Sequence, residues 1–362
     1  MPLDFVTTDE IVQAARRRLH QGAWDYATGG AESETTLRRN RAAFDKVAFR
    51  PRILVDVSHV DPSTTFLGHQ LRIPAMLAPI GSLQVFDPAA AVACAEAAAD
   101  FGTIEVVSTV TDPDLAVTAA STSAPKFFQL YVQGDLKWVE ELLGRVRQAG
   151  YAGLALTVDV AHYSRRERVM VDRWAVPTQL RPDRARERRF GSELTWELMD
   201  EIKRIWGEQP FLLKGVQTAE DAELAVQHGV DVLWVSNHGG RQIDHALGSL
   251  DSLPEIVQAA AGRARIIVDG GVQRGSDIVK ALALGADAVA LGKLQAWALA
   301  AAGRAGVVRM LEILEDEMVC QMALIGVTSV RQLCSSYLTK ADLVTLPHEM
   351  SAWVNLPGGR VR

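Results

Sequence analysis

A short polar turn near the middle of the chain carries the residue types best suited to acid–base chemistry. It reads Ser-Asn-His-Gly-Gly-Arg-Gln over residues 236–242 and follows the apolar run 232–235. Such a run is typical of a buried strand, so His238 and Arg241 stand just beyond a strand end. Histidine can accept a proton near neutral pH, and arginine can hold an anionic group. The turn therefore predicts proton removal from an anionic substrate; the simpler alternative is a surface turn.

Other strand ends carry groups that could complete such a site. Asp159 follows the apolar run 154–158 and could pair with His238, which would orient the imidazole and stabilise its protonated form. Arg166 could join Arg241 as a two-arginine clamp for a substrate carboxylate. Two further candidates are hydroxyl donors: Tyr26 and Tyr131. Taken alone, each of these residues has a purely structural role as its alternative.

From about residue 74 onward, short apolar runs alternate with alanine-rich segments of helical length. The runs are 75–78, 104–107, 126–131, 154–158, 211–214, 232–235, 266–268 and 288–291. This alternation predicts parallel strands joined by helices. Eight such units predict an α/β fold of the closed (β/α)8 TIM-barrel type. The alternative is an open doubly wound sheet, which is disfavoured because no GxGxxG motif follows the first strand.

The barrel divides the chain, residues 1–362, into three parts of one predicted domain. Residues 1–72 are predicted to form an N-terminal helical cap, 73–300 the barrel, and 301–362 C-terminal helices and a tail. An arginine-rich stretch, 165–192, follows the fourth strand and is predicted to be a loop or lid over the barrel mouth. Its charge could instead favour an anionic membrane surface, although no apolar helix face accompanies it.

Composition narrows the class of protein. The net charge of −6 gives no indication of nucleic-acid binding. The three cysteines are widely spaced, so we expect no metal site and a reduced, cytoplasmic setting. The N-terminus lacks the features of a signal peptide, and no apolar run is long enough to span a bilayer. Membrane association is therefore not expected.

Active sites of this fold lie at the C-terminal strand ends, and these ends are unusually polar here. The loops 269–275 and 291–293, after strands seven and eight, are rich in glycine, which lets backbone N–H groups approach a phosphate closely. Arg274 and Lys293 could add positive charge. Lys214 ends strand five inside the barrel, where it needs a carboxylate partner or a ring that becomes anionic on reduction. A phosphorylated cofactor or substrate is therefore predicted.

Several motifs, in order and spacing, resemble the FMN-dependent α-hydroxy acid oxidase/dehydrogenase family, which includes glycolate oxidase, lactate oxidase and mandelate dehydrogenase. The matching segments are 128–131, 156–159, 213–215, 236–242 and 269–271. The resemblance extends from about Asp25 to the C-terminal helices. It implies oxidation of an L-2-hydroxy acid, the (S) form, to a 2-oxo acid with FMN as cofactor.

The resemblance also implies a role for each matching residue. His238 would be the base and Asp159 its carboxylate partner, while Lys214 would stand beside the N1/O2 edge of the flavin. The residues implied to hold the substrate carboxylate are Arg166, Arg241, Tyr26 and Tyr131. The other implied cofactor-binding positions are Pro79, Ile80, Gly81, Ser108, Gln129, Thr157, Ser236, Asp269, Gly270, Gly271, Gln273, Arg274, Gly292 and Lys293. The implied substrate side-chain contacts are Val110 and Tyr163.

The chain departs from the family pattern at several of these positions. Gln273 and Lys293 replace two phosphate-contacting arginines, so FMN could be held more weakly, or Arg274 could substitute. At strand one the usual Pro-Thr-Ala is Pro-Ile-Gly, and Gly81 leaves more room near the flavin. Val110 stands where glycolate-oxidising members have a bulky aromatic residue. This predicts an acid larger than glycolate, such as an aromatic or branched one.

Two alternatives to this function stay open on the sequence. A flavin-dependent isomerase such as type 2 isopentenyl diphosphate isomerase would need a diphosphate site and gives no reason for the His238–Asp159 pair. A non-catalytic flavin binder is supported only by Gln273 and Lys293. The electron acceptor, whether oxygen, a quinone or a carrier protein, is not indicated. A homotetramer is implied by the resemblance alone.

Overall fold

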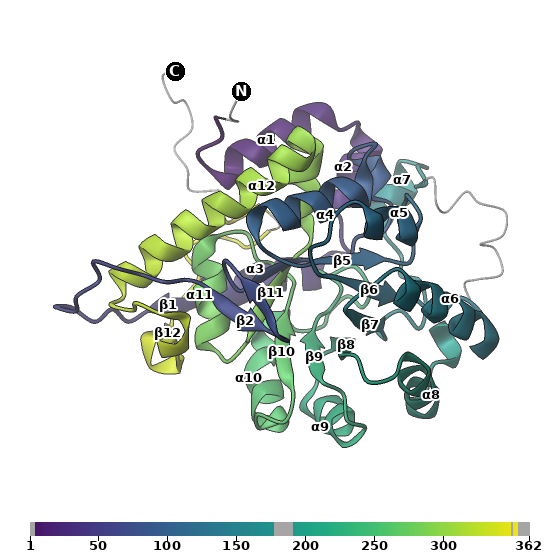
Figure 1. Ribbon diagram of the computed structural model, residues 1–362. Coiled ribbons are helices and arrows are strands. Elements are labelled where there is room, and N and C mark those ends of the chain that lie inside the picture. The colour runs from purple at the N-terminus through teal and green to yellow at the C-terminus, as the bar shows by residue number, and fades with distance from the viewer. Residues whose placement is uncertain (1–3, 177–190, 349, 354–362) are drawn as a thin grey trace.

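The computed structural model describes residues 4–176, 191–348 and 350–353, and its centre is a closed barrel of eight parallel strands (Figure 1). The strands follow one another around the barrel in chain order, and β11 closes it by pairing with β4. They are β4 (Ala75–Leu77), β5 (Glu105–Ser108), β6 (Lys126–Leu130), β7 (Gly153–Thr157), β8 (Phe211–Val216), β9 (Val232–Val235), β10 (Arg265–Val268) and β11 (Ala288–Leu291). The predicted TIM barrel is thus confirmed, with each strand within a few residues of its expected place.

Side chains of both strand faces are buried, which explains why the strands are continuous apolar runs rather than alternating ones. One face fills the barrel interior, with Met76, Phe127, Leu212 and Trp234 among its members. The opposite face packs against the surrounding helices as part of a larger core. The helices are α1 (Thr8–Arg18), α2 (Gln21–Thr28), α3 (Thr35–Asp45), α4 (Ala90–Phe101), α5 (Leu115–Ala120), α6 (Leu136–Gln148), α7 (Glu167–Val171), α8 (Trp196–Trp206), α9 (Ala219–Gln227), α10 (Ser249–Ala260), α11 (Gly275–Ala283) and α12 (Lys293–Leu324).

The N-terminal segment corrects the prediction of a helical cap over residues 1–72. The helices α1 to α3 end at Asp45, and a strand β1 (Val47–Phe49) and a hairpin of β2 (Thr64–Phe66) and β3 (His69–Leu71) follow. The two-residue turn of this hairpin has positive φ at both Leu67 and Gly68, as the right-handed twist of a hairpin requires. Phe66 and Leu71 pack with the barrel-interior side chains. The hairpin therefore closes the barrel at the end opposite to the strand ends that carry the polar residues.

The C-terminal segment is also less helical than predicted. Helix α12 includes non-helical backbone at Ala302 and Gly303, so it comprises the eighth barrel helix and a second helix that packs against α1. A short strand β12 (Leu338–Lys340) follows and pairs antiparallel with β1. Of the predicted loop 165–192, residues 177–190 lie outside the described residues.

Over residues 4–176, 191–348 and 350–353, we find no helix long and apolar enough to cross a membrane. In the same ranges, no group of three or more His, Cys, Asp or Glu is placed to hold a metal ion.

Candidate active site

A cavity of about 590 Å³ lies at the C-terminal ends of the barrel strands, between them and helices α2 and α3. Most of the residues predicted for the site line it. These are Tyr26, Pro79, Ile80, Gly81, Val110, Tyr131, Thr157, Tyr163, Arg166, Lys214, His238, Arg241, Asp269, Gly270, Gly271, Gln273, Gly292 and Lys293. Residues far apart in the chain thus converge because parallel strands place all their carboxyl ends at one mouth.

Four more predicted residues lie directly behind this lining. Asp159 and Ser236 contact His238, and Ser108 and Gln129 form a chain that reaches Thr157. In that chain the Ser108 hydroxyl donates to the Gln129 amide oxygen (2.8 Å), and the Gln129 amide donates to the Thr157 hydroxyl (2.8 Å). The chain fixes which polar atoms these strands present towards the cavity.

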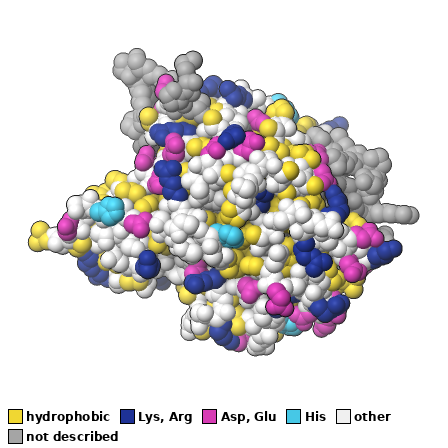
Figure 2. Space-filling view, in the orientation of Figure 1, with side chains coloured by type: hydrophobic (Ala, Val, Ile, Leu, Met, Phe, Trp, Pro, Cys, Tyr) yellow, Lys and Arg dark blue, Asp and Glu magenta, His cyan; other side chains and the backbone are white. Residues whose placement is uncertain are grey.

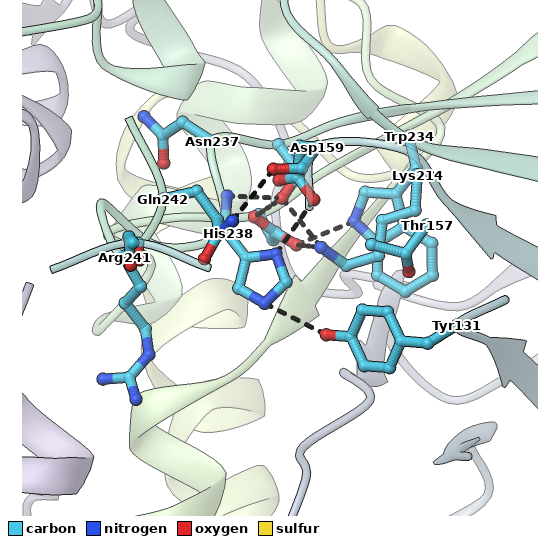
Figure 3. Close-up of polar contacts among 12 residues, drawn as sticks. Tyr131, Thr157, Asp159, Lys214, Trp234, Asn237, His238, Arg241 and Gln242 are labelled. Carbon is cyan, nitrogen blue, oxygen red and sulfur yellow. Dashed lines mark hydrogen bonds and ion pairs between the residues drawn. The ribbon is translucent and has the colours of Figure 1, made fainter. Parts of the chain in front are cut away.

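His238 and Asp159 form the expected pair at the centre of the site (Figure 3). The imidazole Nδ1 lies 3.0 Å from Asp159 Oδ1, and the Asp159 side chain is only 3% exposed. Burial lowers the pKa of His238 below its usual value, although Asp159 opposes this shift. Burial alone would raise the pKa of Asp159, but His238 and Lys214 bring it below its usual value. The pair is therefore a neutral imidazole beside an ionised carboxylate at neutral pH.

The other nitrogen of His238 faces Tyr131. The Tyr131 hydroxyl lies 3.2 Å from Nε2, as Figure 3 shows. Burial, and then the negative charge of Asp159, raise the pKa of Tyr131, so that its hydroxyl stays protonated. Because the carboxylate of Asp159 accepts from Nδ1–H, Nε2 is the unprotonated nitrogen, and its lone pair accepts from the Tyr131 hydroxyl. His238 can thus accept a proton on the side that faces Tyr131.

The backbone of the His238 turn is held by the predicted residue Ser236 and by residues outside the predicted set. His238 has a positive φ of 60°, and its N–H donates to the Ser236 hydroxyl (3.0 Å). The side-chain amides of Asn237 and Asn40 form a reciprocal pair of hydrogen bonds (2.8 and 2.9 Å), and Asn237 Oδ1 also accepts from the Gly240 N–H. Helix α3 therefore fixes this turn through Asn40. Sequence analysis missed Asn40, because nothing in α3 marks it as different from an ordinary helical residue.

Two arginines lie together beside the His238–Asp159 pair. Arg241 donates to the carbonyls of Tyr26 (2.7 Å) and Gly29 (2.8 Å) at the end of α2, and Arg166 donates to the Gln242 amide oxygen (3.2 Å). Burial, followed by the positive charge of Arg166, lowers the pKa of Arg241 to about 10. Two like charges in a partly buried site repel each other, and a bound carboxylate would relieve this repulsion.

Lys214 is neutralised within the floor of the cavity. Its Nζ donates to the Ser236 hydroxyl (2.9 Å) and forms an ion pair with Asp269 Oδ2 (3.3 Å). The Ser236 hydroxyl in turn donates to Asp269 Oδ1 (2.7 Å). This closed set of contacts satisfies the requirement for an anionic partner that the sequence predicted for Lys214.

The glycine-rich end of the cavity fits a phosphate only in part as predicted. Space is open where a Cβ on Gly292 would lie, so backbone there can be approached closely. Lys293 lines the cavity and donates to the Thr28 carbonyl (2.8 Å), and Gln273 lines it as well. Arg274 does not line it: its guanidinium pairs with Glu317 of α12 (2.9 Å). The prediction that Arg274 substitutes for a missing phosphate ligand is therefore not supported by this arrangement.

Arg41 is a second cavity residue that sequence analysis missed. Its guanidinium donates to the Gly271 carbonyl (2.8 Å) and pairs with the buried Asp277 (2.7 Å). Burial alone would raise the pKa of Asp277, but Arg41 brings it below its usual value. Asp277 also accepts from the backbone N–H groups of Gln273 and Arg274 (2.9 and 3.0 Å). This pair therefore holds the loop after β10 in place.

Together, a TIM barrel with a His–Asp pair, two adjacent arginines and a glycine-rich strand end suits an enzyme of an anionic substrate with a phosphorylated cofactor. The sequence profile of the FMN-dependent dehydrogenase family matches residues 15–340, nearly the whole chain. The chain therefore belongs to the FMN-dependent dehydrogenase family, and its cofactor is FMN.

Relatives and solved structures agree with this assignment. Glycolate oxidase 1 of Zea mays is 40% identical, with 95% of this chain and 96% of the relative covered. L-lactate oxidase of Nostoc sp. is 38% identical, with 91% and 96% covered. The crystal structure of mandelate oxidase superposes with a TM-score of 0.86 at 34% identity, covering 94% of this chain and all of that one. The general reaction is therefore the FMN-dependent oxidation of a 2-hydroxy acid.

Proposed function

We propose that this enzyme oxidises an L-2-hydroxy acid with a bulky side chain to the 2-oxo acid. The observation that carries the reaction is a group of four side chains around one space: His238 with its base nitrogen facing Tyr131, and the two arginines beside them. A carboxylate held by Arg166 and Arg241 would place the carbon next to it near the imidazole.

In the proposed reaction, His238 Nε2 accepts a proton from the substrate. The imidazolium that forms is stabilised by Asp159, which already lies 3.0 Å from Nδ1. The Tyr131 hydroxyl, kept protonated by burial, donates to the substrate oxygen. The Tyr26 hydroxyl donates to the Gly81 carbonyl (3.0 Å) in the structure and would turn from it to the substrate as the second donor. The substrate loses two hydrogens, one from its hydroxyl and one from Cα: His238 takes one as a proton, and FMN, when bound, would supply the acceptor for the two electrons and the other hydrogen, which leaves the C=O group of the 2-oxo acid. The cofactor is then reoxidised by oxygen or another acceptor.

The substrate side chain is expected in the apolar part of the cavity. Val110 and Tyr163 line it, together with Val176 and Leu194. Gly81 packs directly against Val110, because a Cβ at position 81 would lie 2.7 Å from Val110 Cγ2. Val110 therefore fills the space beside Gly81, so the expectation that Gly81 leaves more room is wrong, and the room on this wall comes from the small side chain of Val110. Apolar walls favour an aromatic or branched group over hydrogen.

A substrate panel tests this proposal. We expect kcat/KM for aromatic or branched L-2-hydroxy acids to exceed that for glycolate by about tenfold or more, since each added apolar group gains contacts in a pocket that fits it. Val110→Trp should reverse the order by filling the wall. Val117→Trp, at an exposed valine on α5, is the matched control and should leave it unchanged. Glycolate as the best substrate of the wild-type enzyme would contradict the proposal.

The two other functions differ from the oxidation in one experiment. A flavin-dependent isomerase or a non-catalytic flavin binder would hold FMN but would not be reduced by any 2-hydroxy acid. The intact set of His238, Asp159 and the two arginines supports an active enzyme, and the replaced arginines at Gln273 and Lys293 affect only the phosphate end.

We further propose that the enzyme is a cytoplasmic homo-oligomer, a tetramer by likeness to its family. The loop after β1 projects from the body of the molecule at the left of Figure 1, and Figure 2 shows apolar side chains there. Ile53, Leu54 and Val55 of this loop are exposed, and contiguous exposed apolar residues favour contact with another protein surface. Light scattering on the purified protein tests this. Leu54→Asp should reduce the molecular mass of the oligomer in solution, and a monomeric wild-type enzyme would contradict the proposal.

A further inference from the structure

Trp234 is the largest side chain within the barrel, and it lies directly under the residues that surround Lys214. It is a central residue of β9, is completely buried, and pairs in register with Lys214 of β8. Its register partner on the other side is Ile267 of β10. An indole in this place is more than filling, because its N–H group is polar and needs an acceptor when buried.

The acceptor of that N–H group is the carboxylate that neutralises Lys214. Trp234 Nε1 donates to Asp269 Oδ2 (2.9 Å), the same oxygen that lies 3.3 Å from Lys214 Nζ. The Lys214 ammonium also lies 5.4 Å above the centre of the indole ring. Figure 3 shows Trp234 and Lys214 side by side, with both polar contacts directed to one place. One oxygen is therefore shared between a neutral donor and a cation.

From this sharing we infer that Trp234 is a positioning residue that sets how much of the Lys214 charge reaches the flavin ring. The indole N–H occupies Asp269 Oδ2 at normal hydrogen-bond length, and the ammonium is left at the longer distance. Ser236 occupies the other oxygen and also accepts from Lys214. Lys214 is thereby held between Ser236 and the cavity rather than drawn down onto the carboxylate. This inference rests on the proposed place of Lys214 beside the flavin.

The stability of anionic flavin should change in a defined direction when either contact is removed. Without the indole N–H, Asp269 Oδ2 has only Lys214 Nζ as its donor, so the ammonium moves towards the carboxylate. The positive potential at the ring then falls, and any anionic form of the flavin is less stable. Without the Asp269 charge the opposite must occur, because the ammonium is no longer neutralised. Substitutions of Trp234 and of Asp269 should therefore change the stability of the anionic flavin in opposite directions.

Sulfite is a suitable probe, because it needs no substrate. Its sulfur adds to the flavin N5, and the added electron pair leaves a negative charge at the N1–O2 edge, so the dissociation constant of the adduct reports the local positive potential. Trp234→Phe keeps a ring under Lys214 but lacks the N–H group. We expect it to raise the sulfite Kd about threefold or more and to lower the flavin reduction potential, as the loss of one charge-assisted hydrogen bond suggests.

Two further variants separate this effect from simple packing. Asp269→Asn should lower the sulfite Kd by about tenfold, since a charge in contact with the ammonium is removed. Trp206→Phe is the matched control: Trp206, the last residue of the outer helix α8, is equally buried, and its indole N–H donates to the Pro210 carbonyl (3.2 Å). It should leave the sulfite Kd unchanged. Trp234→Met, which also lacks a donor, should repeat the effect of Trp234→Phe.

The outcomes decide between three cases. Opposite shifts in Trp234→Phe and Asp269→Asn, with no shift in Trp206→Phe, support the inference. A Trp234 variant that behaves like Trp206→Phe overturns it and leaves Trp234 as a packing residue. Lys214→Met serves as the reference for the proposed function: if it also leaves the sulfite Kd unchanged, Lys214 does not face the flavin, and the inference fails together with that placement.

Discussion

The two ends of the cavity meet the sequence predictions very differently. At the substrate end, His238, Asp159, Arg166, Arg241 and the two tyrosines come together as their residue types suggested, with His238 between Asp159 and Tyr131. At the phosphate end, Lys293 lines the cavity, but Arg274 is turned away onto Glu317.

The difference shows what a strand-end motif can and cannot fix. At the substrate end, each side chain has a partner across the cavity, and the turn that carries His238 is pinned by Asn40 and Ser236. At the phosphate end, the loop backbone is equally well held, through Asp277 and Arg41. A long side chain such as Arg274, however, can reach either of two anions, a cofactor phosphate or a carboxylate of the chain. A carboxylate of the chain itself, Glu317, lies 2.9 Å from it. Position in a motif therefore predicts the backbone better than the direction of a long side chain.

The largest effect is expected at His238. His238→Ala should lower the rate of flavin reduction by 2-hydroxy acids by about 10²- to 10⁴-fold, because it removes the general base. FMN should stay bound with an unchanged spectrum, since Lys214 and the glycine-rich end are untouched. His228→Ala is the matched control, because His228 also contacts an aspartate (Asp200, 2.8 Å) but lies on the outer helices. A reduction rate near that of the wild-type enzyme in His238→Ala would contradict the assignment.

The next effect is expected at Asp159 and includes a pH signature. For the wild-type enzyme, kcat/KM should rise with pH as His238 loses its proton, with an apparent pKa below the usual histidine value of about 6.5. Asp159→Asn removes a negative charge that favours the imidazolium, so the pKa of His238 falls and the rise of kcat/KM should occur at lower pH.

The rate of Asp159→Asn at the plateau should fall by about 10²-fold, since the imidazolium formed in the reaction loses its partner. A pH–rate profile of both enzymes, with Asp200→Asn as control, measures the two effects. If the rise of kcat/KM occurred at higher pH in Asp159→Asn, Asp159 would not act on His238 by its charge.

At the phosphate end, Lys293 should carry a smaller but measurable effect. Lys293→Ala should raise the FMN dissociation constant about tenfold, as expected for the loss of one charge-assisted contact with a phosphate. Titration of the apoprotein with FMN, followed by flavin fluorescence, measures it. An unchanged constant would mean that the backbone of the glycine-rich loops holds the phosphate alone.

The smallest effect is expected at Arg274. It tests whether this side chain stays turned away from the phosphate end of the cavity. Because its guanidinium pairs with Glu317 and does not line the cavity, Arg274→Ala should change the FMN dissociation constant by less than about twofold, and the partly exposed ion pair should contribute only about 0–1 kcal/mol to stability. A loss of FMN affinity as large as that of Lys293→Ala would show that Arg274 turns to the phosphate when the cofactor binds.

Much of the fold was predictable because barrel strands are buried on both faces and are therefore continuous apolar runs in the sequence. The place of the proposed catalytic residues was predictable because they follow those runs closely, as His238 follows β9 and Asp159 follows β7. The hairpin at residues 64–71 was missed because its strands are only three residues long each. Asn40, Arg41 and Trp234 were missed for another reason: each acts through a tertiary contact, and within a helix or a buried strand its type carries no local signal.

The central claim is that this cavity oxidises 2-hydroxy acids through FMN, with the substrate held by its carboxylate. An anaerobic absorption spectrum, recorded before and after addition of L-2-hydroxy acids and their methyl esters, tests it most directly. We predict that a bulky L-2-hydroxy acid bleaches the flavin band with one equivalent of 2-oxo acid formed, that its ester does not, and that the return of the band in air identifies an oxidase. A bound flavin that no 2-hydroxy acid bleaches, or that acid and ester bleach equally well, would contradict the claim.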